Sequence, residues 1–193
     1  MNDSRFSNSP ALALGPWILA AMIVLACLSR FMPHPPNFSP IAAVALFGGA
    51  FFANRTLAIV VPLVALLISD LAMGLGNGGV YGEYLGSTSQ ILVFVAMILT
   101  SMIGFGLRNN KRSLPVIGAA IVSTALFFLI TNFGAFLSYS MYPKTLSGLG
   151  QAYVAGIPFL KWSLLSTLMY SGILFGGFQL LRRTTPSLHA QTV

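Results

Sequence analysis

One carboxylate of this chain, that of Asp70, lies in an apolar run, where burying a charge costs free energy. Asp70 falls inside the apolar run Thr56–Leu75, and the whole chain of 193 residues holds only 3 acids. The run has the length of a membrane span, which needs about 20 apolar residues. A charge at membrane depth usually faces a bundle interior, a cavity or a partner. We therefore expect an internal polar site, with Asp70 as one of its binding groups.

A second polar group, the amide of Asn132, also lies late in an apolar run. A buried amide must find hydrogen-bond partners, and in a membrane bundle these lie on facing helices. Asn132 and Asp70 would thus either pair with one another or both contact a ligand. The sequence leaves both interpretations open.

Tyrosines gather on one expected side of the membrane. An interfacial aromatic belt would appear at both surfaces, whereas the other side has almost no Tyr or Trp. The tyrosines therefore either form a one-sided belt or wall an outward-facing pocket. Glu83 lies in a glycine-rich segment among them, which would be a lid over a ligand or simply a mobile loop. The expected pocket tyrosines are Tyr81, Tyr84, Tyr139, Tyr142 and Tyr153.

The chain lacks the residue patterns of an enzyme. It contains no HExxH, GxSxG or phosphate-loop motif, and its only cysteine, Cys27, lies in a different segment from His34. One cysteine also excludes a thiol-rich metal site within one chain. We expect a binder or transporter with no catalytic residues, no metal and no cofactor.

The elements that must position these groups are membrane helices. The chain is 56% hydrophobic and 7% charged, whereas a soluble domain carries about 25% charged residues. Its basic residues are dispersed between apolar runs, and nucleic-acid binding needs them clustered on one face. We therefore exclude nucleic acid and predict an all-α integral membrane protein, with one transmembrane domain over 12–181. The six predicted spans are 12–29, 39–53, 56–75, 89–107, 115–139 and 155–181.

The basic residues predict the orientation. Cytoplasmic loops carry the excess of Lys and Arg in membrane proteins, and the segments on the two sides divide these residues unequally. We expect both termini in the cytoplasm, as polar tails over 1–11 and 182–193. The expected cytoplasmic residues are Arg5, Arg55, Arg108, Lys111, Arg112, Arg182 and Arg183, against Arg30, Lys144 and Lys161 outside.

Small residues recur every four positions on three spans, with Ala119 and Ser123 on the fifth. Such spacing lets helices approach closely in lipid. It serves either packing within the chain or docking of a membrane partner, and the pattern does not separate the two. The other residues are Ala45, Gly49 and Ala53 on the second span, and Gly172 and Gly176 on the sixth.

Five strings together carry a family resemblance: Pro33–Phe52 (PHPPNFSPIAAVALFGGAFF), Pro62–Gly74, Phe127–Leu137 (FFLITNFGAFL), Met141–Phe159 and Leu174–Phe178. They resemble a family of small bacterial membrane proteins labelled as domains of unknown function, over about residues 20–180. That family in turn resembles the substrate-binding S components of energy-coupling-factor (ECF) vitamin transporters. The solitary BtuM-type cobalamin S components are the most similar among them.

The resemblance implies an S-component-like six-helix bundle with an outward-facing vitamin pocket. Transport would proceed by reorientation of the whole protein, with or without an ECF energising module. Cobalamin or another corrinoid would be the first substrate candidate. BtuM-type proteins resemble one another in a cobalt-ligating cysteine in the loop after the third helix, where this chain has none. Axial ligation of a corrinoid would then come from His34, the nearby imidazole, or be absent.

We therefore expect a multi-pass protein of the bacterial cytoplasmic (inner) membrane that binds and translocates a vitamin-like micronutrient. The alternative is a structural membrane protein resembling the scaffold protein MreD. That alternative predicts no small-molecule ligand and a stable protein partner.

Overall fold

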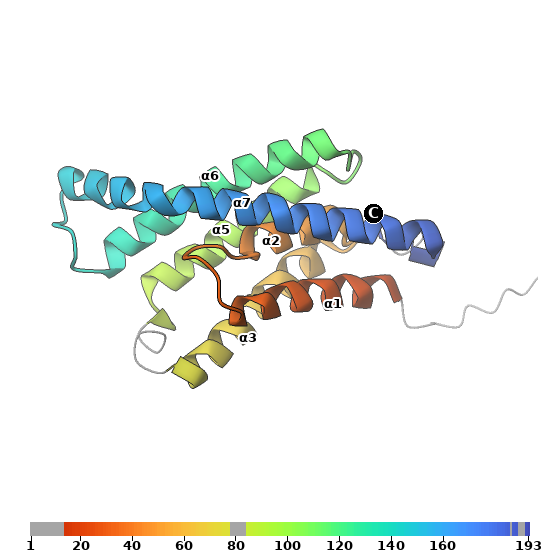
Figure 1. Ribbon diagram of the computed structural model, residues 1–193, viewed down its shortest axis with the longest axis horizontal. Coiled ribbons are helices and arrows are strands. Elements are labelled where there is room, and N and C mark those ends of the chain that lie inside the picture. Colours follow the sequence, from red (N-terminus) through yellow and green to blue (C-terminus); the bar gives the residue numbers. More distant parts are fainter. Residues whose placement is uncertain (1–13, 78–83, 186, 189–191) are drawn as a thin grey trace, which may run out of the picture.

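Helices make up most of the part of the chain that the structure describes. The computed structural model describes residues 14–77, 84–185, 187–188 and 192–193. Within these residues the only β pairing is an isolated bridge between Phe52 and Thr192, so the prediction of an all-α protein is confirmed for them. The helices are α1 (Leu14–Leu28), the 3₁₀ turn η1 (Ser29–Phe31), α2 (Ile41–Phe51), α3 (Arg55–Asn77), α5 (Thr88–Phe105), α6 (Ser113–Ser138) and α7 (Leu146–Thr184) (Figure 1).

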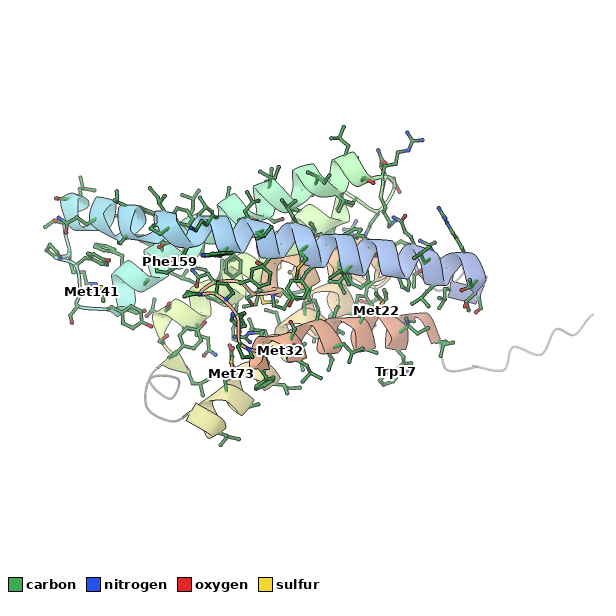
Figure 2. The ribbon with its side chains drawn as sticks, in the orientation of Figure 1. Trp17, Met22, Met32, Met73, Met141 and Phe159 are labelled. Atoms are coloured by element: carbon green, nitrogen blue, oxygen red, sulfur yellow. The ribbon has the colours of Figure 1, made fainter. Side chains whose placement is uncertain are left out.

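Five of these helices are long and apolar enough to cross a membrane: α1 with η1, α3, α5, α6 and α7. Large apolar side chains cover their outer faces. Leu25, Val122 and Ile173 are each more than half exposed, and Trp17 points away from the bundle in Figure 2. An apolar exterior of this kind is favourable in contact with lipid and unfavourable in contact with water. The helices therefore indicate a multi-pass membrane protein.

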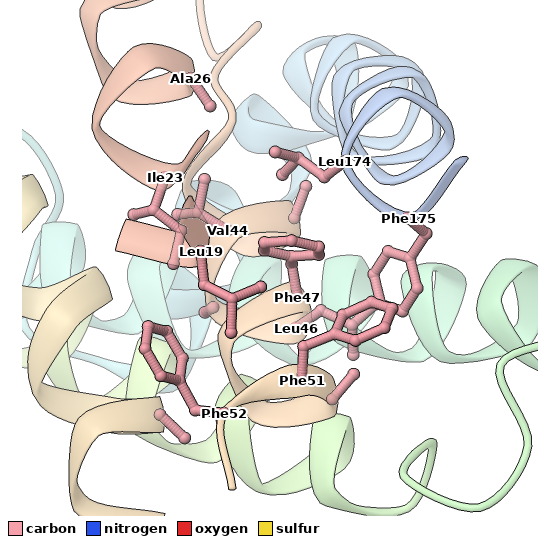
Figure 3. Close-up of a cluster of buried hydrophobic side chains, with 14 of the residues drawn as sticks. Leu19, Ile23, Ala26, Val44, Leu46, Phe47, Phe51, Phe52, Leu174 and Phe175 are labelled. Carbon is pink, nitrogen blue, oxygen red and sulfur yellow. The ribbon is translucent and has the colours of Figure 1, made fainter. Parts of the chain in front are cut away.

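The second predicted span is wrong as a span. The segment 39–53 does form a helix, α2, but its 11 residues reach only about 16 Å, against a hydrocarbon core of about 30 Å. All but the first of its residues are buried. Phe47 and Phe51 lie between α1 and α7, beside Leu174 and Phe175 (Figure 3). A helix that is apolar on every side is typical of a buried core helix, and α2 is the centre around which the long helices pack.

Glycines bring the backbones of α2 and α5 into contact. A Cβ at Gly49 would overlap the carbonyl oxygen of Ser101, and a Cβ at Gly104 would overlap that of Leu46. The obstructing atoms are backbone atoms, which cannot rotate away as a side chain does. Only glycine therefore fits at either position, and the crossing fixes α2 against α5.

Arg108 caps the carboxyl-terminal end of α2 with two hydrogen bonds. Its Nε donates to Gly49 O at 3.1 Å and its Nη2 to Phe52 O at 2.8 Å. The last carbonyls of a helix have no partner within the helix, and a cation there is also favoured by the helix dipole. Arg108 thereby allows a helix to end inside a membrane bundle.

Several other cations gather at this same end of the bundle, which we call the basic end. Arg55 and Arg108 lie over the Phe105 ring, with their guanidinium carbons 5.5 and 4.6 Å from its centroid. Lys111 Nζ lies 5.3 Å from the centroid of Phe51. These residues were all predicted to share one side of the membrane, and the fold brings them together.

The carboxyl-terminal residues also dock on the basic end. Helix α7 continues to Thr184, Leu188 is fully buried, and the Val193 N–H donates to Phe51 O at 3.1 Å. The segment predicted as a polar tail over 182–193 therefore contributes to packing in its described part. The other predicted tail, 1–11, lies outside the described residues.

Candidate functional site

A buried ion pair fixes the far end of the bundle. Arg30 lies in η1, directly after α1, and its Nη2 is 2.7 Å from Asp70 Oδ1 on α3. The Asp70 side chain is 1% exposed and the Arg30 side chain 11%. Arg30 Nη1 also donates to the hydroxyl of Ser69. The Arg30 guanidinium thus offsets the free-energy cost of burying the Asp70 carboxylate on α3.

Arg30 was predicted only as a cation on the expected outer side and not as a site residue. The available signal was a lone acid inside one span and a lone cation directly after another, because a charge at membrane depth usually has a partner. No periodicity connects two residues so far apart in sequence. Only the fold shows that this cation, and not Asn132, pairs with Asp70.

The turn that carries Arg30 is held by α7. Ser29 Oγ donates to Ala26 O at 2.6 Å and lies 2.6 Å from the hydroxyl of Tyr170. Because the Ser29 proton is directed at Ala26, Tyr170 is the donor to Ser29. The Tyr170 ring also packs on Phe38, with 6.2 Å between the centroids. Tyr170, the one tyrosine that was not placed on the expected outer side, is therefore the residue that positions η1.

Arg30 lines a cavity of about 220 Å³ between η1, the start of α2, α6 and α7. We call this part of the molecule the cavity end. The apolar wall consists of Ile41, Ala42, Leu66, Val93, Phe127 and Phe128. The polar lining residues are Arg30, Asn37, Ser39, Tyr84, Thr124, Thr131, Asn132, Ser163 and Thr167.

The hydroxyls of the cavity wall mostly donate back to their own helices. Thr124, Thr131 and Thr167 each donate to the carbonyl oxygen four residues earlier, at 2.8 Å. Their oxygen lone pairs remain as acceptors. The buried hydroxyl of Ser39 has no hydrogen-bond partner among the described residues. Arg30 is the one cation among the lining residues that the structure describes.

The predicted binding residues divide into four groups, of which the last does not line the cavity and is described below. Tyr84 and Asn132 line the cavity, whereas Asp70 touches it only through Arg30. Asn132 Nδ2 donates to Phe128 O at 2.8 Å, and its Oδ1 is pressed against Gly156 of α7. The third group, Tyr81 and Glu83, lies outside the described residues.

The remaining predicted residues do not line the cavity. Tyr153 lies one layer behind it, with its hydroxyl donating to Leu129 O at 2.9 Å and its ring against Phe128. Tyr139 is exposed and its carbonyl accepts from Lys144. Tyr142 lies in the α6–α7 connection, and His34 is exposed with Nε2 3.2 Å from Arg30 O. Apart from Tyr84, the aromatic lining comes from Phe127 and Phe128 of α6.

The chemistry available at this cavity is hydrogen bonding. Among the described residues no three His, Cys, Asp or Glu side chains come together as metal ligands. The lining offers a guanidinium, hydroxyls and two amides beside aromatic and aliphatic surface. Concave sites with a few convergent polar groups on an apolar wall are typical of small-molecule binding.

The small residues spaced four apart have different surroundings on α2 and on α7. Ala45 and Gly49 are buried within the chain, and Ala53 is exposed just after the end of α2. A Cβ at Gly172 or Gly176 would meet nothing within 4 Å. The spacing on α2 therefore serves packing within the chain, whereas that on α7 is not used for it.

Comparisons with known proteins place the chain by family. Neither the curated proteins nor the solved structures include a match to it. A family model described as a family of unknown function (DUF6580) matches residues 11–188, which is nearly the whole chain. The protein belongs to this DUF6580 family.

Proposed function

We propose that the protein binds a small polar molecule in the cavity beside Arg30 and carries it across the membrane, as a vitamin-uptake protein similar to an ECF S component. The observation that carries this proposal is the buried Arg30–Asp70 pair, which contacts a polar cavity inside an apolar bundle. Polar groups at membrane depth are costly and typically mark substrate pathways. A packing role alone would be met by apolar residues at lower cost.

The cavity supports a substrate smaller than a corrinoid. Its volume is about 220 Å³, below the range of about 300–1,000 Å³ for drug-sized ligands. A corrinoid is larger than such ligands, and His34 does not face the cavity. A single-ring or two-ring vitamin matches the space better.

Arg30 has N–H donors beyond those directed at Asp70 and Ser69, and these favour an acceptor group such as a carboxylate on the substrate. A guanidinium presents donors in a planar fork that matches a carboxylate. The threonine oxygens and the Asn132 amide would then contact hydroxyl or N–H groups elsewhere on the molecule. We infer that the substrate carries a carboxylate at one end and neutral polar groups at the other.

The distribution of Lys and Arg favours one orientation of the protein in the membrane. If the basic end faces the cytoplasm, as the distribution of Lys and Arg favours, the cavity end faces outward. A substrate would enter there, and release inside would require the protein to reorient or open towards the basic end.

Uptake of a labelled vitamin panel tests the proposal. Cells that express the protein receive radiolabelled biotin, pantothenate and nicotinate one at a time. The variant Arg30→Gln/Asp70→Asn removes both charges but keeps hydrogen-bonding groups, and Lys161→Gln removes an exposed cation that does not line the cavity. We expect uptake of one panel member by the wild type and by Lys161→Gln, and its loss in the double variant. Unchanged uptake in the double variant would contradict the proposal.

A further inference from the structure

A second hollow lies between α6 and α7 and extends from the basic end as far as Leu168, the residue after Thr167 of the cavity lining. This groove has a volume of about 600 Å³, and Gly172 and Gly176 form its floor on α7, where no side chain fills the space. Ile117 and Ala120 of α6 and Phe175 of α7 form apolar walls. Both helices are long and apolar enough to cross a membrane, so we infer that the groove opens towards lipid.

Two polar features distinguish the groove from ordinary lipid-facing surface. Lys111 and Arg112 stand at its basic end, beside Gln179. Ser171 lines it as well, is 2% exposed, and has a hydroxyl without a hydrogen-bond partner among the described residues. Lys111 Nζ donates to Arg108 O and Gln179 Nε2 donates to Lys111 O, but a purely apolar occupant would leave the Arg112 charge and the Ser171 hydroxyl without a partner in the groove.

The charge at the mouth of the groove is strongly one-sided. Asp70 is the one acidic side chain among the described residues and lies at the other end, paired with Arg30, so no described acidic side chain reaches Lys111 or Arg112. Burial, and then the charges of Arg182 and Arg108, lower the pKa of Lys111 to about 8. An anion beside Lys111 would relieve this repulsion.

We propose that the α6–α7 groove binds one anionic phospholipid, with its phosphate at Lys111 and Arg112 and an acyl chain lying over Gly172 and Gly176. An apolar trough in the bilayer that ends in cations matches a molecule that is apolar along its length and negative at its head. Basic pockets between transmembrane helices on the cytoplasmic side bind such headgroups. The lipid would fill the space between α6 and α7 and stabilise their packing.

Lipid binding by the purified full-length protein tests this assignment. The protein, delipidated in detergent, is titrated with phosphatidylglycerol or phosphatidylcholine, and bound lipid is counted by native mass spectrometry. Two variants act on the groove: Gly176→Leu fills its floor, and Arg112→Gln removes an exposed cation at its mouth. Their matched controls are Gly118→Leu, on an open face of α6 outside the groove, and Arg183→Gln, an exposed cation not on its lining.

We expect one phosphatidylglycerol bound in preference to phosphatidylcholine. Arg112→Gln should weaken its binding about fivefold, since a basic residue near an anionic lipid surface contributes about that factor. Gly176→Leu should abolish the preferred site, and both controls should bind as the wild type does. Equal binding of the two lipids, or an unchanged site in Gly176→Leu, would overturn the proposal. A co-purifying membrane polypeptide that Gly176→Leu displaces would overturn it too, because the groove would then belong to a protein partner.

Discussion

Arg30 contacts the cavity, whereas Asp70 contacts Arg30 and not the cavity. The carboxylate therefore holds and neutralises the guanidinium, and the guanidinium would meet a ligand. This division of roles differs from the simplest interpretation of the sequence, in which Asp70 itself touches the substrate. Substitutions at Arg30 and Asp70 test this division of roles.

Removing one member of the buried pair should cost more than removing both charges. Arg30→Gln leaves Asp70 buried without a cation, and breaking a buried pair in this way costs about 3–5 kcal/mol. In Arg30→Gln/Asp70→Asn no charge remains, so much of that stability should return. Thermal unfolding in detergent gives the order wild type, double variant, single variant. A double variant less stable than Arg30→Gln would contradict the compensating role of the pair.

Lys111 should make stability depend on pH. Burial, Arg182 and Arg108 lower its pKa from 10.5 to about 8 in the folded protein, so between these values the unfolded chain binds more protons. Stability contributed through this group therefore rises with pH over that window. We expect the unfolding temperature of delipidated wild type, relative to that of Lys111→Met, to increase from pH 8 to pH 10. Parallel curves for the two proteins would show that Lys111 is not perturbed.

At the scale of elements, length and hydropathy predicted the five long helices because they depend only on local composition. They misassigned α2, since a short, wholly apolar segment is the same by composition whether it faces lipid or is surrounded by protein. What decides its place is contact: Gly49 against Ser101 of α5, and Arg108 on its last carbonyls. The small-residue spacing around Gly49 predicted a close approach but not which helix makes it, and the Arg108 contact has no local sequence pattern.

The α2–α5 crossing gives an element-scale prediction. Gly49→Ala places a Cβ onto backbone atoms of α5 and should destabilise the fold by about 1–3 kcal/mol or more. Gly118→Ala, on an open face of α6, adds a methyl that meets nothing within 4 Å and should be neutral or slightly stabilising. Unfolding temperatures of the two variants provide the comparison. Equal effects would mean that the helices do not cross so closely.

At the scale of the whole molecule, the bundle has two polar ends of different character. The basic end collects dispersed cations that the sequence assigned to one side, and this grouping was predictable from charge alone. The cavity end was predictable only in part. Asn132 and Tyr84 were recognised by residue type, but Arg30, Ser39 and the threonines meet there through contacts between distant helices.

Cysteine labelling in intact cells tests the orientation of these two ends. In a Cys27→Ala background, Lys161→Cys and Arg112→Cys each introduce one exposed thiol at opposite ends. A membrane-impermeant maleimide should label the Lys161→Cys protein directly and the Arg112→Cys protein only after permeabilisation, because the basic end is expected inside. The reverse pattern would place the cavity end in the cytoplasm and argue against uptake.

The most direct measurement of the central claim is identification of small molecules that leave the purified protein on denaturation. Wild type is compared with Thr131→Phe, which fills the cavity, and with Val122→Phe, which adds the same ring on the exposed face of α6. We predict one carboxylate-bearing small molecule, near one per protein, in wild type and Val122→Phe and none in Thr131→Phe. Wild type that remains empty after incubation with the vitamin panel, or equal retention in Thr131→Phe, would contradict the account.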